Sequence, residues 1–197
     1  MSAGNPSSPL SYGAWLLRSP GLLAGFLWGF AEGTLFFIIP DLLITFAALF
    51  SLKQSLKQLG VVLAGSLLGG WLMFSLAAWD YPATRRIVDG VPFVTPRMFE
   101  ATQRNYEASG LWTLGQGPLS GIPYKVFAIE APAHASLLPF LLASIPGRLE
   151  RLALPWVLFA TAGLWLKRRI AKRPGWAVSG HAFFWIAVYA CYWSVVR

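Results

Sequence analysis

A stretch from Leu59 to Trp79 that contains no charged side chain most constrains what this sequence can fold into. About 20 consecutive apolar residues are enough for a helix to cross the hydrocarbon core of a bilayer, so this stretch predicts a membrane-spanning helix. Only 12% of the residues are charged, about half the share found in soluble domains. Ten Trp and six Tyr also suit the aromatic belts at membrane boundaries. The sequence therefore predicts an all-α membrane protein, with residues 1–197 as a single integral membrane domain.

Four further apolar blocks surround this stretch, namely residues 21–50, 111–143, 152–166 and 176–196. The block 152–166 is uncharged, and its helix is expected to begin near Arg148. Between the blocks, residues 80–110 contain four acids and four bases. They predict an external segment with an amphipathic helix over 96–108 at the membrane surface.

Blocks 21–50 and 111–143 are too long for one crossing, and proline interrupts both. The interruptions are Pro40 in the first and Pro118, Pro123, Pro132 and Pro139 in the second. Proline removes a backbone donor and clashes with the preceding turn, and irregular backbone at membrane depth survives only inside protein or beside a wet cavity. Two half-helices that enter and leave on one side, a re-entrant hairpin, satisfy both conditions. The alternative for each block is one tilted, kinked helix.

The distribution of basic residues predicts an orientation. Lys53 and Lys57 follow the first block, and five bases lie within 167–173. Under the positive-inside rule both groups face the cytoplasm. The chain then contains two inverted repeats, residues 21–79 and 111–166, each a re-entrant hairpin followed by a transmembrane helix. In such proteins the site lies near the bilayer midplane, between the broken helices. An extra C-terminal helix, 176–196, completes the fold, and it has no function readable from the sequence.

Two acidic residues, Glu32 and Asp41, lie inside the first apolar block. A charge at the bilayer centre costs roughly 2.5–3.5 kcal/mol on insertion scales, so neither side chain is expected to face lipid. They could couple transport to protons or another ion, or pair with basic residues of the second hairpin. The alternative is a capping role, because Asp41 directly follows Pro40 and aspartate is a common turn residue.

Three basic residues, Lys125, Arg148 and Arg151, are the expected substrate-binding side chains. Lys125 follows Pro123 in the second hairpin, and the arginines are three residues apart and share a helical face. Guanidinium and ammonium groups both suit phosphate, so the expected guest is an anionic lipid headgroup. Alternatively, the arginines are interfacial anchors that extend toward the headgroup region. Glu130, Pro40 and Pro123 are the expected supporting residues.

Other features argue against several classes of site. The single cysteine, Cys191, excludes an intramolecular disulfide and any multi-cysteine metal site. His134 and His181 lack ligand spacing, so neither a metal nor a cofactor is expected. Because the basic residues cluster between apolar blocks, the net charge of +8 does not indicate a nucleic-acid partner. No removable signal peptide is expected at the N-terminus.

Several motifs resemble those of the DedA family, the SNARE-associated or VTT-domain membrane proteins. The similarity covers about residues 21–166 and is carried by Phe30-Ala31-Glu32-Gly33, Pro40-Asp41, the glycine-rich stretch 65–70, Gly121-Ile-Pro-Tyr-Lys-Val-Phe-Ala and Gly147-Arg-Leu-Glu-Arg. The family's second-hairpin motif has arginines on both sides of its proline, whereas here Gly121 precedes Pro123 and Lys125 follows it. The resemblance implies a multi-pass protein of the bacterial inner membrane. It also implies that Glu32 and Asp41 are the acidic pair, and that Lys125 and Arg148 stand where the family has functional bases.

The leading hypothesis is accordingly a membrane lipid transporter, a flippase or scramblase, and not an enzyme. Its cargo would be an anionic lipid such as undecaprenyl phosphate or a phospholipid, with protons or sodium as coupling ions. Two alternatives are a membrane-embedded scaffold or assembly factor, which predicts a stable co-purifying partner, and a small-ion exchanger, which predicts ion flux without lipid movement. An oligomer is compatible with each of these hypotheses.

Overall fold

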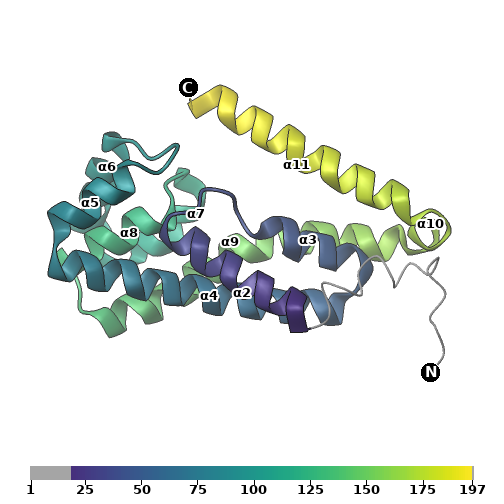
Figure 1. The fold of residues 1–197 in the computed structure, drawn as a ribbon, viewed down its shortest axis with the longest axis horizontal. Coiled ribbons are helices and arrows are strands. Elements are labelled where there is room, and N and C mark those ends of the chain that lie inside the picture. The colour runs from purple at the N-terminus through teal and green to yellow at the C-terminus, as the bar shows by residue number, and fades with distance from the viewer. Residues whose placement is uncertain (1–18, 197) are drawn as a thin grey trace.

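The computed structural model describes residues 19–196, and the described chain is helical throughout, without a β-strand (Figure 1). The expected all-α class is therefore confirmed. The expectation about a signal peptide lies outside the described residues. The helices are α2 (Ser19–Thr34), α3 (Asp41–Phe50), α4 (Leu52–Trp79), α5 (Tyr81–Asp89), α6 (Pro96–Ser109), α7 (Thr113–Ser120), α8 (Tyr124–Glu130), α9 (Leu137–Trp165), α10 (Lys167–Lys172) and α11 (Pro174–Val196), with short 3₁₀ turns at Gly110–Trp112 and Ala131–Ala133.

Helices α2 and α4 run parallel and pack with their backbones in contact. Gly29 of α2 lies against the backbone of Val62, and Gly65 of α4 lies against the carbonyl of Phe26. Gly33 and Gly69 face each other one turn further along. A side chain at any of these positions would push the helices apart, which is why small residues at four-residue spacing form membrane helix interfaces. The glycine-rich stretch of α4 therefore forms a helix-packing face.

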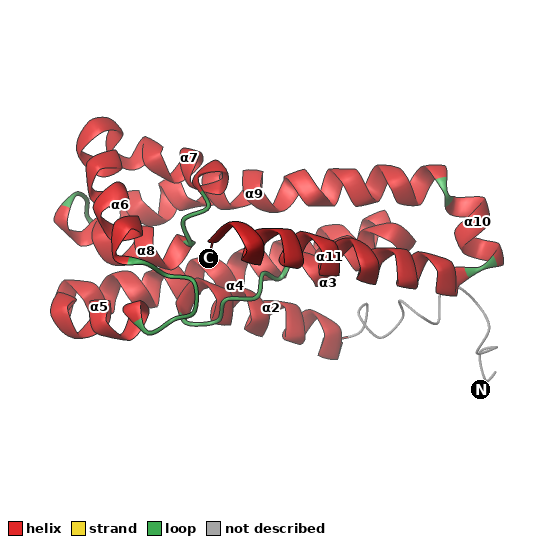
Figure 2. Ribbon diagram, turned by 90° about the horizontal axis from the view of Figure 1, so that it is seen from above, coloured by secondary structure: helices red, strands yellow, loops and turns green. Residues whose placement is uncertain are grey.

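Helix α9 runs antiparallel to α4 along most of its length (Figure 2). At one end of the pair, the indole N–H of Trp156 donates to Ser55 Oγ at 2.8 Å. At the other end the rings of Phe74 and Phe140 stack, with their centroids 5.2 Å apart. Helix α3 packs on α9, and α8 packs on α4. The two long helices therefore form the frame on which the shorter helices are placed.

The expected start of the helix near Arg148 is wrong. Helix α9 begins at Leu137 and continues through both Pro146 and Pro155. Each proline removes one intrahelical hydrogen bond, but packing against α4 and α7 holds the helix together across both positions. As a result Arg148 lies near the middle of a 29-residue helix instead of at its mouth.

Each of the two blocks that proline was predicted to interrupt contains a break between helices, at Pro40 and at Pro123. Residues 35–40 separate α2 from α3, and residues 121–123 separate α7 from α8. Gly121 adopts a left-handed conformation with φ of 71°, which glycine tolerates without a Cβ penalty. Pro118 lies within the helical span of α7, so it does not break the chain as expected.

The segment 80–110 forms two helices that pack at one end of α4 and α8. Helix α6 occupies the region in which an amphipathic helix was predicted, and it buries Phe99, Thr102 and Tyr106. Helix α5 was not anticipated. It begins after Asp80, whose carboxylate accepts the backbone N–H of Ala83 at 2.9 Å as an N-cap.

Helix α11 lies obliquely across the body and touches it along one edge (Figure 1). The edge consists of Ala177, His181 and Trp185, which are buried, and Tyr189, which is partly buried, at four-residue spacing. By length and composition, α4 is the only helix in the described chain that qualifies as a candidate membrane span.

Candidate functional site

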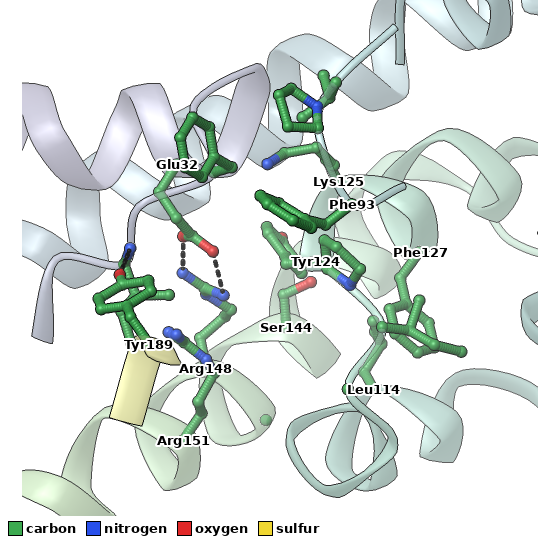
Figure 3. Close-up of a pocket in the computed structure, with 18 of the residues that line it drawn as sticks. Glu32, Phe93, Leu114, Tyr124, Lys125, Phe127, Ser144, Arg148, Arg151 and Tyr189 are labelled. Carbon is green, nitrogen blue, oxygen red and sulfur yellow. Dashed lines mark hydrogen bonds and ion pairs between the residues drawn. The ribbon is translucent and has the colours of Figure 1, made fainter. Parts of the chain in front are cut away.

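A partly enclosed cavity of about 240 Å³ lies where the two chain breaks approach each other (Figure 3). Its polar wall carries Glu32, Lys125, Arg148 and Arg151, so the structure brings together four of the five residues predicted to bind substrate or couple ions. The remaining wall is mainly apolar and comes from the α5–α6 connection, α7, the break between α7 and α8, α8 and α11. It includes Val91, Phe93, Leu114, Ile122, Phe127 and Val188.

Glu32 and Arg148 form a buried, two-pronged ion pair (Figure 3). Arg148 Nη1 donates to Glu32 Oε1 at 3.4 Å, and Nη2 donates to Oε2. Glu32 lies in the last turn of α2 and Arg148 in the middle of α9, and both side chains are about 95% buried. A planar guanidinium matches both oxygens of a carboxylate, which explains why arginine is suited to this position.

Asp41 and Arg151 form a second ion pair beside the first. Arg151 Nη2 donates to Asp41 Oδ2 at 3.1 Å. Asp41 is the first residue of α3, where a negative charge also interacts favourably with the helix dipole. Its side chain is therefore paired across the fold and does not serve only as a local cap. Asp41 contacts the cavity through Arg151 and is not part of the cavity lining.

The side chain of Lys125 connects the two breaks. Lys125 lies in the first turn of α8 and is only 2% exposed. Its ammonium group donates to the carbonyl oxygen of Phe36, in the break between α2 and α3, at 2.9 Å. One of the roles considered for the acidic pair was pairing with bases of the second hairpin. The direct partners are instead the arginines of α9, while Lys125 binds the opposing backbone.

The two expected supporting prolines lie at equivalent places in the breaks. Pro40 immediately precedes α3, and Pro123 immediately precedes α8 and lines the cavity. The ring of a proline fixes φ near the value that a helix requires, which favours a helix start directly after an irregular segment. Both prolines therefore position the first turn that carries a charged residue, Asp41 in α3 and Lys125 in α8.

Among the buried side-chain atoms of residues 19–196, two arginine nitrogens have no hydrogen-bond partner, Nε of Arg148 and Nη1 of Arg151. Nearly all buried polar groups in proteins are paired, so two guanidinium nitrogens without a protein partner at one cavity are available to an acceptor that enters it. The ring of Tyr124 covers the guanidinium of Arg148 at 4.7 Å and excludes solvent from one face. Three bases face two acids here, so an anionic acceptor suits the site.

Glu130 lies in a separate polar cluster and not in this cavity. It accepts hydrogen bonds from the hydroxyl of Tyr81 and from Gln103 Nε2, the latter at 3.0 Å. Burial and the neighbouring carboxylate raise the pKa of Tyr81 to about 12, so this phenol remains a donor at neutral pH. The cluster ties α5 and α6 to the end of α8.

Sequence reasoning missed the cavity residues Tyr124, Ser144, Phe93 and Tyr189. Tyr124 stands inside the Gly-Ile-Pro-Tyr-Lys motif and could have been found there. Phe93 is the only described non-glycine residue with positive φ, at 69°, and no sequence pattern indicates it. The signal for Tyr189 was the four-residue spacing of His181, Trp185 and Tyr189 in α11.

Tyr189 connects α11 to the break between α2 and α3. The backbone N–H of Ile39 donates to the Tyr189 hydroxyl at 3.0 Å. Tyr189→Phe is expected to lower stability by about 0.5–1.5 kcal/mol, because this N–H then loses its acceptor. Hydrogen exchange at Ile39 should accelerate, as measured by mass spectrometry. Ser179→Ala, on the exposed side of α11, is the control, and equal exchange in both variants would contradict the assignment.

The two histidines occupy structural positions. His181 Nε2 lies 2.9 Å from Thr45 Oγ1, and His134 stacks on Tyr106. Among residues 19–196 there is no group of three histidine, cysteine or acidic side chains that could hold a metal ion.

No protein-family model, curated protein or solved structure matches this chain. Its function is therefore inferred from the geometry and chemistry of the site.

Proposed function

We propose that this chain is a membrane lipid transporter that moves an anionic, phosphate-bearing lipid between bilayer leaflets, as the resemblance to the DedA family implies. The observation that carries the proposal is the cavity itself. It combines two buried bases, Lys125 and Arg148, and the partly buried Arg151 with a wall of aromatic and aliphatic side chains. Both arginines have a buried nitrogen without a hydrogen-bond partner. An amphipathic molecule with an anionic head suits both walls, whereas a small inorganic ion uses only one.

The arrangement of helices supports two inverted repeats. In each half a broken helix pair precedes a long helix, α2 and α3 before α4, and α7 and α8 before α9. The packing is reciprocal, because α3 contacts α9 of the other half while α8 contacts α4. We take each pair as a re-entrant hairpin in the bacterial inner membrane, with α4, α9 and α11 as the crossings. The breaks then meet near the midplane, where Lys125 contacts Phe36.

The phosphate would bind between Arg148 and Arg151. Each guanidinium has one buried nitrogen without a hydrogen-bond partner, and Arg151 lies one helical turn beyond Arg148 on the same face of α9. Lys125 contributes a third positive charge from α8. Arginine forks bind phosphate oxygens in pairs, which gives directional recognition in addition to charge. The acyl or prenyl chains would remain against the apolar wall and the surrounding lipid.

Binding of the headgroup would compete with the carboxylates for the arginines. In the structure, Glu32 and Asp41 occupy guanidinium positions that a phosphate could also use. A carboxylate displaced from its arginine in a low-dielectric cavity is stabilised by taking up a proton or sodium ion. Arrival of the phosphate at Arg148 would thus favour cation uptake at Glu32, and this exchange would couple lipid movement to an ion gradient.

Headgroup translocation by purified protein in liposomes tests the proposal. Lys125→Ala is expected to reduce the translocation rate at least tenfold, because the headgroup then loses one of three charged contacts. Arg104→Ala, an exposed base of α6 outside the cavity, is the matched control and should retain the wild-type rate. Equal rates in wild type, Lys125→Ala and protein-free liposomes would refute the transport proposal.

The same preparations distinguish the two other functional hypotheses. Proton or sodium flux without lipid movement would identify a small-ion exchanger. Absence of both fluxes, together with a stable partner in native membranes, would identify a scaffold. Neither has a specific observation in its favour, because a basic cavity with unpaired arginine donors is suited to an anion.

A further inference from the structure

One end of the molecule is uniformly basic. Five exposed bases lie in helix α10 and at the residue that follows it. They are Lys167, Arg168, Arg169, Lys172 and Arg173. The first turns of α4 reach the same end (Figure 1) and add two exposed bases, Lys53 and Lys57. We refer to these seven side chains as the basic end.

No acidic residue moderates this charge. The chain contains no Asp or Glu between residues 42 and 79, nor after Glu150. The opposite end, formed by α5 and α6, is balanced, since four acids and four bases lie within residues 80–110. On a surface with equal numbers of acids and bases the charges offset one another, whereas the basic end carries seven like charges that repel one another. A negatively charged partner would relieve that repulsion.

The basic end is held in a defined orientation. Ile170, on the inner side of α10, is 4% exposed and packs in a hydrophobic cluster that includes Leu49, Phe159 and Ala177. Because Ile170 faces inward, the exposed bases on either side of it point away from the body. The N–H of Ile170 also bonds to the carbonyl of Leu166 at 2.9 Å, which continues the helical turn out of α9.

Exposed tryptophans flank the bases. Trp165, at the end of α9, is 91% exposed, and Trp176, at the start of α11, is 56% exposed. Tryptophan rings favour the boundary between hydrocarbon and headgroups, where an apolar body and a polar N–H are both accommodated. Bases beside two such rings, at the end of a long apolar helix, indicate a lipid surface better than they indicate a nucleic acid or a protein.

We propose that the basic end is a binding surface for anionic phospholipids, in which the seven bases contact headgroup phosphates and Trp165 and Trp176 lie at the hydrocarbon boundary. This surface is distinct from the cavity, and the proposal does not depend on lipid translocation. It assigns α10 to the leaflet that carries the anionic lipid, because juxtamembrane bases are attracted to negative surface potential within a Debye length.

Lipid binding to the full-length protein, measured by native mass spectrometry, tests the surface. The affinity for phosphatidylglycerol is compared with that for phosphatidylcholine, which has no net charge. The triple variant Arg168→Gln, Arg169→Gln, Lys172→Gln is expected to bind phosphatidylglycerol at least tenfold more weakly than wild type. The matched triple Arg86→Gln, Arg97→Gln, Arg104→Gln removes as many exposed bases from the balanced end and should bind as wild type does. All six positions are exposed, so both triples should fold, and their melting temperatures in detergent verify this.

Two further measurements separate this surface from the cavity and from other partners. Lys125→Ala should retain phosphatidylglycerol binding at the basic end, even if translocation is lost. Added salt should weaken binding, because exposed charges are screened. Equal loss in the two triples would overturn the proposal, as would equal affinity for both lipids. Retention of nucleic acid in place of lipid by wild type, lost only in the α10 triple, would overturn it in favour of a nucleic-acid surface.

Discussion

Arg148→Ala is expected to destabilise the protein by about 3–5 kcal/mol, the cost typical of removing one partner from a buried ion pair. The substitution leaves Glu32 buried without its two hydrogen bonds from Arg148. It also removes the guanidinium that packs against the ring of Tyr124. Part of the loss should be recovered if Glu32 takes up a proton, so the destabilisation should be smaller at acidic pH.

Chemical unfolding in mixed detergent micelles measures this effect. The double variant Glu32→Gln, Arg148→Met is the decisive comparison, because it removes both charges and keeps similar volumes. Its stability should exceed that of Arg148→Ala, since no unpaired charge remains, but its lipid translocation should be lost. A double variant as unstable as the single variant would show that Arg148 stabilises the fold by packing and not by charge. Arg86→Ala, exposed on α5, serves as the control for a lost arginine.

Gly65→Ala is expected to lower stability by about 1–3 kcal/mol, the range for overpacking a tight interface. A methyl group at this position would overlap the carbonyl oxygen of Phe26 and lie 3.0 Å from the backbone nitrogen of Phe30. Both contacts are with backbone, so no side chain can rotate away to relieve them. Helices α2 and α4 must then separate, and Glu32 at the end of α2 moves relative to Arg148.

Gly60→Ala provides a matched control in the same helix. A Cβ at this position meets nothing within 4 Å, and alanine is a better helix former than glycine. Its stability should therefore equal or slightly exceed that of wild type. The two glycine-to-alanine changes in α4 are thus expected to have opposite signs. Similar destabilisation by both would contradict the close backbone contact between α2 and α4.

Much of the architecture could be predicted because it depends on local features. The apolar run before Trp79 predicts a long helix, which the structure contains as α4. Pro40 and Pro123 predict breaks, since proline removes a backbone donor wherever it occurs. The outcome for α9 was less predictable. Pro146 and Pro155 are the same residue type, yet the helix continues through both because neighbouring helices support it.

The candidate site was predictable in composition but not in connectivity. The cost of burying charge required Glu32 and Asp41 to find partners, and Lys125, Arg148 and Arg151 were the available bases. Which base pairs with which acid depends on the register between α9 and the helices beside it. The start of α9 was predicted too late in the sequence. Both arginines were therefore placed at the mouth of a helix, whereas in the structure they lie beside the break between α2 and α3.

The sequence by itself determined that this chain is helical, that Pro40 and Pro123 mark breaks between helices, and that Glu32 and Asp41 must be kept away from lipid. These points follow from residue type and the cost of desolvating charge. Only the tertiary structure decided that Arg148 binds Glu32, that Arg151 binds Asp41 and that Lys125 reaches the carbonyl of Phe36. It also decided that Tyr189 of α11 lies at the same cavity. The physical reason is that a helix presents its side chains every 100°. The partner of each charge is therefore set by the register and rotation of packed helices, which glycine contacts and core packing determine far from the charge itself.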